Sequence, residues 1–149
     1  MKRWGEFAQE SSELAESGRQ LLYQFGPGLA FLATVDRDSA PRLHPIVIAQ
    51  ELDGLYMFLV PSPKRRDLEH SSRYALHSFP PEEVDDEFAL RGESHRMDDP
   101  AIRAAIADAV QFDVSDDQQL YELLIDSALL ARYEHRGQWP PAYSVWTST

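Results

Sequence analysis

Three adjacent cations follow a serine and a proline in the segment Ser62–Leu68, which reads SPKRRDL. Serine is a preferred helix N-cap and proline is favoured at the first helical position, so the segment predicts the start of a helix. A helix N-terminus carries partial positive charge and free N–H groups, which bind anions. Lysine and arginine side chains add full positive charges there. The segment therefore predicts an anion site, and phosphate is the anion that such a site suits best.

The charge of the whole chain limits the partners of this site. The formal net charge is -11 at pH 7, from 14 Lys and Arg residues against 25 Asp and Glu residues. Nucleic acids need a cationic surface, so we predict no nucleic-acid partner. An acidic block, Glu82–Glu87, follows the basic cluster closely and is typical of a solvated loop. From composition alone, a solvated surface explains the basic cluster as well as a binding function does.

Other residues that could carry chemistry are few. The chain has no cysteine, which excludes thiol nucleophiles, disulfides and zinc–thiolate sites. Ser62 has no acid–base partner nearby in sequence, so a capping role is favoured over nucleophilic catalysis. None of the histidines pair at metal-ligand spacing, and we predict no metal site. The five histidines are His44, His70, His77, His95 and His135.

Hydrophobic periodicity and turn residues predict the elements that must position the cations. Hydrophobic residues make up 43% of the chain, which indicates one folded domain over residues 1–149. Residues 120–134 are compatible with a helix or a strand, and a strand is favoured over their second half. Helices are predicted over about 6–25, from Ser62 onward, and over 101–110. Strands are predicted over 29–35, 42–50, 55–60, 73–79, 87–96 and 143–147.

Short strands joined by tight turns favour an antiparallel barrel over a parallel sheet. Pro45 predicts that the second strand lies at an edge or contains a bulge, and Gly92 predicts a bend in the fifth strand. The N-terminus lacks the apolar stretch of a signal peptide, and no run approaches the length of a membrane span. We therefore expect a soluble, cytoplasmic protein with no membrane partner.

The order of these pieces resembles the pyridoxamine 5′-phosphate oxidase-like family of flavin-binding split barrels. The resemblance covers roughly residues 20–110 and depends on the ordered series more than on any one motif. It implies a mainly β fold with peripheral helices, a six-stranded antiparallel split barrel of the FMN-binding type. It also implies a homodimer that holds flavin mononucleotide (FMN) in a cleft between the subunits. The motifs are FLATVD (31–36), APRLHPIV (40–47), LYMF (55–58), SPKRRDL (62–68), RYAL (73–76) and EFALRG (87–92).

The resemblance further implies which residues hold the cofactor. Ser62 and Lys64 would bind its phosphate, with Arg65 and Arg42 next in order. Val60 would contact the ribityl chain or the phosphate. The strand segment 44–47 would line the isoalloxazine ring, largely through backbone groups, and residue 87 stands where pyridoxamine oxidases carry a flavin-contacting glutamine. The full implied set is Arg42, His44, Pro45, Ile46, Val47, Val60, Ser62, Lys64, Arg65 and Glu87.

The chain departs from the pyridoxamine oxidases in two places. Pro63 replaces the first of two adjacent basic residues, and the C-terminal VWTST lacks their substrate-binding Arg-Leu-x-Pro sequence. The resemblance therefore implies an FMN-dependent oxidoreductase acting on a small molecule that the sequence does not identify. The alternatives are a reductase that uses the deazaflavin F420 and a flavin-binding module without catalysis. Without the resemblance, the chain would be interpreted as a small acidic interaction domain.

Overall fold

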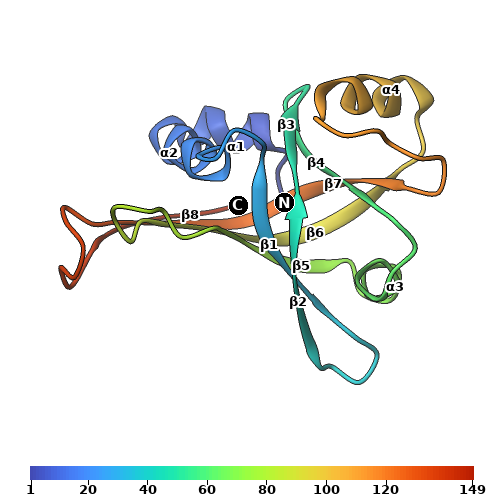
Figure 1. Ribbon diagram of the computed structural model, residues 1–149. Coiled ribbons are helices and arrows are strands. Elements are labelled where there is room, and N and C mark those ends of the chain that lie inside the picture. The colour runs from blue at the N-terminus through green and yellow to red at the C-terminus, as the bar shows by residue number, and fades with distance from the viewer.

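One curved antiparallel sheet organises the molecule (Figure 1). The structure is a computed structural model that describes residues 1–149. The strands follow the order β2-β1-β5-β6-β7-β4-β3, and β8 pairs with β7 to complete eight. The prediction of a mainly β fold with peripheral helices is confirmed, whereas the expected number of six strands is wrong. The strand bounds are β1 Leu29–Val35, β2 Pro41–Val47, β3 Ala49–Glu51, β4 Gly54–Leu59, β5 Arg73–Ser78, β6 Glu87–Met97, β7 Gln119–Arg132 and β8 Ala142–Thr147.

The segment predicted as one strand over 42–50 changes its partner at Ile48. Its first part, β2, pairs with β1, and its second part, β3, pairs with β4. Between them, the Ile48 N–H donates to the carbonyl of Gly28 at 2.9 Å, just before β1 begins. β2 and β3 are the two end strands of the sheet order, so the short connection at Ile48 brings the two ends of the sheet together. The two strands do not pair with each other, and the barrel is open between them. β2 is an edge strand, which confirms the expectation from Pro45.

The N-terminal helix predicted over 6–25 is wrong in its bounds and in being single. The chain forms α1 Trp4–Glu10 and α2 Ser12–Leu22, because Ser11 takes a non-helical backbone (φ -146°, ψ 68°). The break lets each helix turn its own apolar face inward, and both cover one end of the barrel (Figure 1). The other helices, α3 Pro63–His70 and α4 Pro100–Ala109, begin after the predicted caps Ser62 and Asp99. No helix has the length and apolar character needed to cross a membrane.

The segment 120–134 is strand as far as Arg132, as part of β7, so pairing resolves the ambiguity between helix and strand. β7 pairs with β6 over most of its length and with β4 and β8 along its other edge. The predicted bend in β6 is confirmed, because the β6–β7 register shifts between Arg91 and Gly92. A Cβ at Gly92 would lie 1.8 Å from the carbonyl oxygen of Leu124, so only glycine allows the strands to approach at this bulge.

The inner face of the sheet encloses the main core of 22 buried residues. In β1, for example, Ala30, Leu32 and Thr34 are buried and alternate with more accessible residues. A second cluster of five buried residues lies beneath α4, around Phe58 and Ile106. Residues of β2, β4 and α3 contribute to the main core, and the predicted anion site lies where these elements meet.

Candidate functional site

The start of α3 has the geometry of a capped, open helix N-terminus. Ser62 is extended (φ -163°, ψ 163°), and its Oγ accepts from the N–H of Arg65 at 3.4 Å, which confirms the predicted cap. The same hydroxyl donates to the carbonyl of Val60 at 2.9 Å. Pro63 occupies the first turn and brings no N–H. The N–H of Lys64 has no intrahelical acceptor, since residue 60 lies outside the helix, and it is available to a ligand.

The cations of this segment differ in what they already bind. Arg65 pairs with Glu69 at 3.4 Å and donates to the carbonyl of Asp117 at 2.9 Å, so it links α3 to the turn before β7. Lys64 and Arg66, in contrast, form no ion pair within the chain. Lys64 and Arg66 are therefore the cations of α3 whose charges no ion pair offsets, and Lys64 is the one of these two that the sequence analysis assigned to the phosphate.

A buried carboxylate fixes α3 against β1 and β2. Asp67 Oδ2 accepts from Arg42 Nε at 2.8 Å and from Thr34 Oγ1 at 2.7 Å. Burial raises the pKa of Asp67, but the hydrogen bonds from Arg42 and Thr34 and the charges of Arg42 and Arg66 outweigh burial, so its pKa lies below the usual range. Arg42 thus holds α3 in position and has its charge compensated inside the protein.

His44 lies beside this ion pair with an unsatisfied ring nitrogen. Its Nε2 is buried and has no hydrogen-bond partner. Burial lowers the pKa of His44, and the nearby charges of Lys64 and Arg42 lower it further, against the opposing effect of Asp67. Buried polar atoms in proteins are almost always paired, so an orphan between cations fits a site that is completed by a ligand. An anionic group with a hydroxyl or other hydrogen-bonding function would satisfy both the nitrogen and the charges.

We call Ser62, Lys64, His44 and the first turn of α3 the phosphate seat. Strand alternation divides the other predicted residues between the two faces of β2. Arg42, His44 and Ile46 are opposite Thr34, Leu32 and Ala30 of β1 and share their inner face. Pro45 and Val47 point to the outer face. Ile46 is only 8% exposed, so it offers backbone groups alone, whereas Val60, just after β4, is 43% exposed beside the seat.

Glu87 does not join the phosphate seat within one chain. It begins β6, which lies three strands from β2 in the sheet, so about 14 Å separates it from that strand. Its Oε1 lies 3.7 Å from Nε2 of His77 on β5, the nearest opposite charge when the imidazole is protonated. Glu87 and the phosphate seat are therefore not neighbours within one chain.

The outer face of the sheet carries a second feature, which the sequence analysis missed. The pairing registers align its side chains in two rows across six strands. The first row is Leu43, Ala33, Ala75, Arg91, Ser127 and Thr147. The second row is Pro45, Phe31, His77, Ala89, Leu129 and Val145. We call these two rows the outer face.

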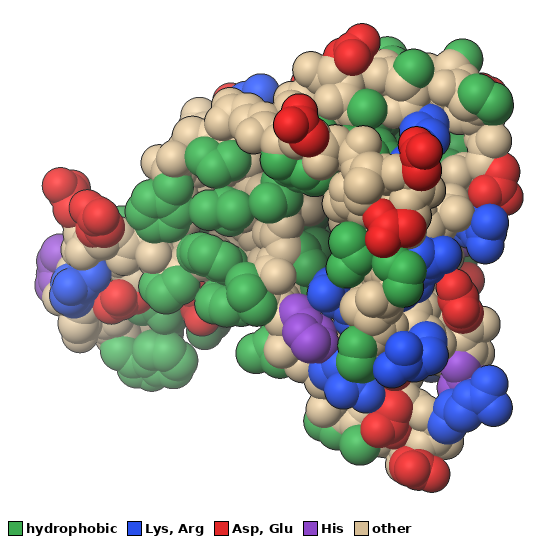
Figure 2. All heavy atoms as spheres, turned by 45° about the vertical axis from the view of Figure 1, so that its right-hand side comes forward, with side chains coloured by type: hydrophobic (Ala, Val, Ile, Leu, Met, Phe, Trp, Pro, Cys, Tyr) green, Lys and Arg blue, Asp and Glu red, His purple; other side chains and the backbone are tan.

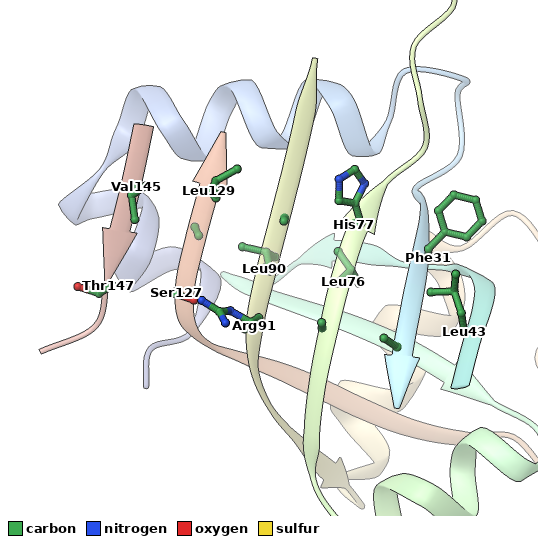
Figure 3. A pocket seen from close by; sticks show the side chains of 14 residues that line it. Phe31, Leu43, Leu76, His77, Leu90, Arg91, Ser127, Leu129, Val145 and Thr147 are labelled. Carbon is green, nitrogen blue, oxygen red and sulfur yellow. The ribbon is translucent and has the colours of Figure 1, made fainter. Parts of the chain in front are cut away.

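The outer face is hollowed and mostly apolar. The hollow has a volume of about 370 Å³, and 10 of its 14 lining residues are hydrophobic (Figure 3). Leu43, in the first row, and Val145, in the second row, are each 65% exposed. Aliphatic side chains exposed within one apolar patch are typical of a surface that binds another molecule. The space-filling view shows hydrophobic side chains gathered on one part of the surface and Lys and Arg side chains gathered near its lower right (Figure 2). The run LAFLA in β1, apolar on both faces of the strand, is the signal that could have predicted this surface.

Comparison with solved structures identifies the fold. A NimC/NimA family protein from Clostridium acetobutylicum has a TM-score of 0.65 at 14% identity, covering 93% of each chain. A heme binding protein from Mycobacterium smegmatis has a TM-score of 0.68 at 18% identity, covering 90% of this chain and 57% of that chain. A candidate pyridoxamine 5′-phosphate oxidase from Listeria innocua has a TM-score of 0.62 at 14% identity, covering 76% of this chain and 94% of that chain.

These similarities establish the pyridoxamine 5′-phosphate oxidase-like split-barrel fold that the sequence motifs implied. At such low identity they establish the fold alone. The chain spans little more than half the length of the heme binding protein. The sequence matches no protein-family model and no curated protein.

Proposed function

We propose that this split barrel binds FMN and acts as an FMN-dependent oxidoreductase on a small molecule. The observation that carries the proposal is the phosphate seat, where an uncompensated lysine and an orphaned histidine nitrogen meet an open helix N-terminus. Each charge-assisted hydrogen bond to a phosphate contributes about 1.5–3 kcal/mol, so two or three such bonds would anchor the cofactor. Because the net charge of -11 repels anions in general, binding of a phosphate depends on these local positive groups.

The residues present fit the phosphate and ribityl groups of FMN. Lys64 and the N–H groups of the first turn of α3 would bind the phosphate, with the Ser62 hydroxyl and His44 Nε2 beside them. Arg65 could turn toward the phosphate from its exposed pairing with Glu69, whereas Arg42 would act through Asp67 by fixing α3. Val60 and the backbone of β2 around Pro45 and Val47 would contact the ribityl chain and the ring. The flavin supplies the redox chemistry when bound.

A homodimer is part of the proposal. Antiparallel sheets of monomers usually present one polar face to water, but here both faces of β1 and its neighbours are apolar. A second copy would bury the outer face and would bring its own Glu87 toward the phosphate seat of the first. The cofactor would then lie in a cleft between subunits, and each site would need residues from both chains.

The test is titration of the apoprotein with FMN, riboflavin and F420, followed by flavin fluorescence. The proposal predicts tight binding of FMN, weaker binding of riboflavin, which lacks the phosphate, and weak binding of F420. Preference for F420 would favour the deazaflavin-dependent reductase instead. The rate at which bound reduced flavin is oxidised by a panel of acceptors separates an enzyme from a binding module. A binding module would give a rate no higher than that of free reduced flavin. Absence of any binding would overturn the proposal.

One observation favours haem as a second candidate ligand. His77 lies on the apolar outer face, and its Nδ1 is 2.6 Å from the carbonyl of Ser78, to which it donates in the Nδ1–H tautomer. In that tautomer Nε2 keeps its lone pair, as in a histidine that binds a metal, and the nearest charged group to it is Glu87 Oε1 at 3.7 Å. One similar structure is a heme binding protein. Haem titration followed by absorbance, repeated with His77→Ala, would identify haem binding by a band that the variant lacks.

A further inference from the structure

His44 is the member of the phosphate seat that can titrate near neutral pH. It lies on the inner face of β2, opposite Leu32 of β1. Its Nε2 is enclosed by the protein and forms no hydrogen bond with any protein group. A neutral imidazole has an N–H on one ring nitrogen, whereas a protonated imidazole has an N–H on both. The imidazole can therefore gain a proton, and a second donor, when a ligand reaches Nε2.

The charges around His44 come from its own strand and from α3. The strands packed on β2, namely β1 and β4, carry no charged side chain. Lys64 and Arg42 act on the imidazole as cations, and Asp67 acts on it as an anion. Arg42 and Asp67 are joined at 2.8 Å, so their charges largely offset each other at His44. The further charges that act on this ion pair are Arg66, on the carboxylate, and Asp36, on the guanidinium.

The empty seat keeps His44 neutral. Burial lowers the pKa of His44 most, and the charges of Lys64 and Arg42 lower it further, against the opposing charge of Asp67. With Arg42 and Asp67 offsetting each other, the excess near the ring is about one positive charge, that of Lys64. A ligand with one negative charge would cancel this excess, and a ligand with two would reverse it.

Phosphate monoesters bring that second negative charge. The second pKa of a phosphate monoester is about 6, so the group carries about 1.5 to 2 negative charges near pH 7. A phosphodiester has a single ionisable oxygen and carries only one charge. Two charges beside Nε2 favour the protonated imidazole, whose Nε2–H then donates a charge-assisted hydrogen bond to a phosphate oxygen. The proton comes from solvent, and no covalent bond of the ligand changes.

We propose that His44 takes up one proton when a phosphate monoester occupies the seat, and that this proton makes His44 the residue that selects monoesters over diesters. Lys64 attracts anions of either kind, whereas the protonated form of His44 is stabilised only by the dianion. The affinity for a monoester therefore rises as the pH falls, because the bound state holds more protons than the empty protein. The application to FMN, itself a phosphate monoester, rests on the proposed function, but the selection of monoesters stands on the groups around His44.

Nuclear magnetic resonance of the His44 imidazole tests the proton uptake directly. The pKa of His44 is measured in the full-length protein alone, with methyl phosphate and with dimethyl phosphate. We expect methyl phosphate to raise the His44 pKa by about one to two pH units, and dimethyl phosphate to raise it by less than about half a pH unit. An unchanged His44 pKa in methyl phosphate overturns the inference, and so does an equal rise in dimethyl phosphate.

FMN titrations at several pH values provide a second measurement. His44→Gln keeps an N–H donor that does not titrate, and His95→Gln removes an exposed histidine of β6 as the control. Dividing each affinity by that of His44→Gln cancels the titration of the phosphate itself. From about pH 8 to about pH 6, this ratio should rise at least about threefold for the original protein and for His95→Gln. The corresponding ratio for riboflavin should stay constant, and a constant ratio for FMN overturns the inference.

The inference and the proposed function fail in different ways. If FMN does not bind but methyl phosphate raises the His44 pKa, the proposed function is contradicted and the selection of monoesters stands. If FMN binds while the His44 pKa stays at its value in the empty protein, the flavin site stands and the role of His44 is contradicted.

Discussion

Replacing Lys64 with methionine tests the phosphate seat with a measurable magnitude. Lys64 forms no ion pair, so its replacement breaks none and leaves the cap at Ser62 intact. The lost interaction is one charge-assisted hydrogen bond to the phosphate, about 1.5–3 kcal/mol. At about 1.4 kcal/mol per tenfold change, the affinity for FMN should fall about 10- to 150-fold.

Riboflavin provides the internal control, because it has the same ring and ribityl chain without the phosphate. Lys64→Met should leave riboflavin affinity within about twofold, since the energy removed belongs to the phosphate contact alone. Arg37→Met removes the same net charge outside the seat and should weaken neither ligand strongly. Titrations at low and high salt separate a direct contact from the general field of the protein. Equal losses for FMN and riboflavin, or no loss for either, would refute the assignment of Lys64 to the phosphate.

Three further predictions concern the sheet and its ionisable groups. Leu129→Asp places a charge in the apolar outer face and should raise the dimer dissociation constant at least 100-fold, about 3 kcal/mol, in sedimentation; an unchanged dimer would move the interface elsewhere. Gly92→Ala should lower the free energy of unfolding by about 1–3 kcal/mol in urea denaturation, because its Cβ would meet the Leu124 carbonyl; an unaffected variant would mean that the bulge can relax. Because the pKa of Asp67 is lowered in the folded protein, this residue stabilises the fold above about pH 4, and the stability is lost as the pH falls through that pKa. Asp67→Asn should therefore weaken the dependence of the free energy of unfolding on pH in the acid range, measured by urea denaturation at several pH values. An unchanged pH dependence would assign it to other carboxylates.

The sequence predicted the elements that local chemistry determines. Ser62 and Pro63 fixed the start of α3, and Asp99 did the same for α4, because cap and first-turn preferences act over only a few residues. Gly92 predicted the bulge for the same reason. The break at Ser11 was not predicted, since a serine among polar residues, here between Glu10 and Ser12, fits a helix surface as well as a helix boundary. Only the packing of Phe7 and Leu14 on the barrel decides it.

The candidate site was predictable in its type but not in its arrangement. The cluster at Lys64 indicated an anion site, but the buried Asp67 that binds Arg42 comes from a contact between residues 25 apart in sequence. The distance between Glu87 and the phosphate seat depends on sheet order, which local patterns do not give. The outer face becomes visible only when the registers of six strands are aligned, since each strand contributes one residue to each row.

The most direct test of the account is a fluorescence titration of the unmodified, cofactor-free protein with FMN under low-salt conditions. The account predicts saturable quenching with one flavin per chain and a dissociation constant of about 1 μM or tighter, equivalent to about -8 kcal/mol. A protein purified with the cofactor in place would also show flavin absorbance. Absence of saturation at flavin concentrations far above that value would contradict the central claim that the Lys64 cluster of this split barrel is a flavin phosphate site.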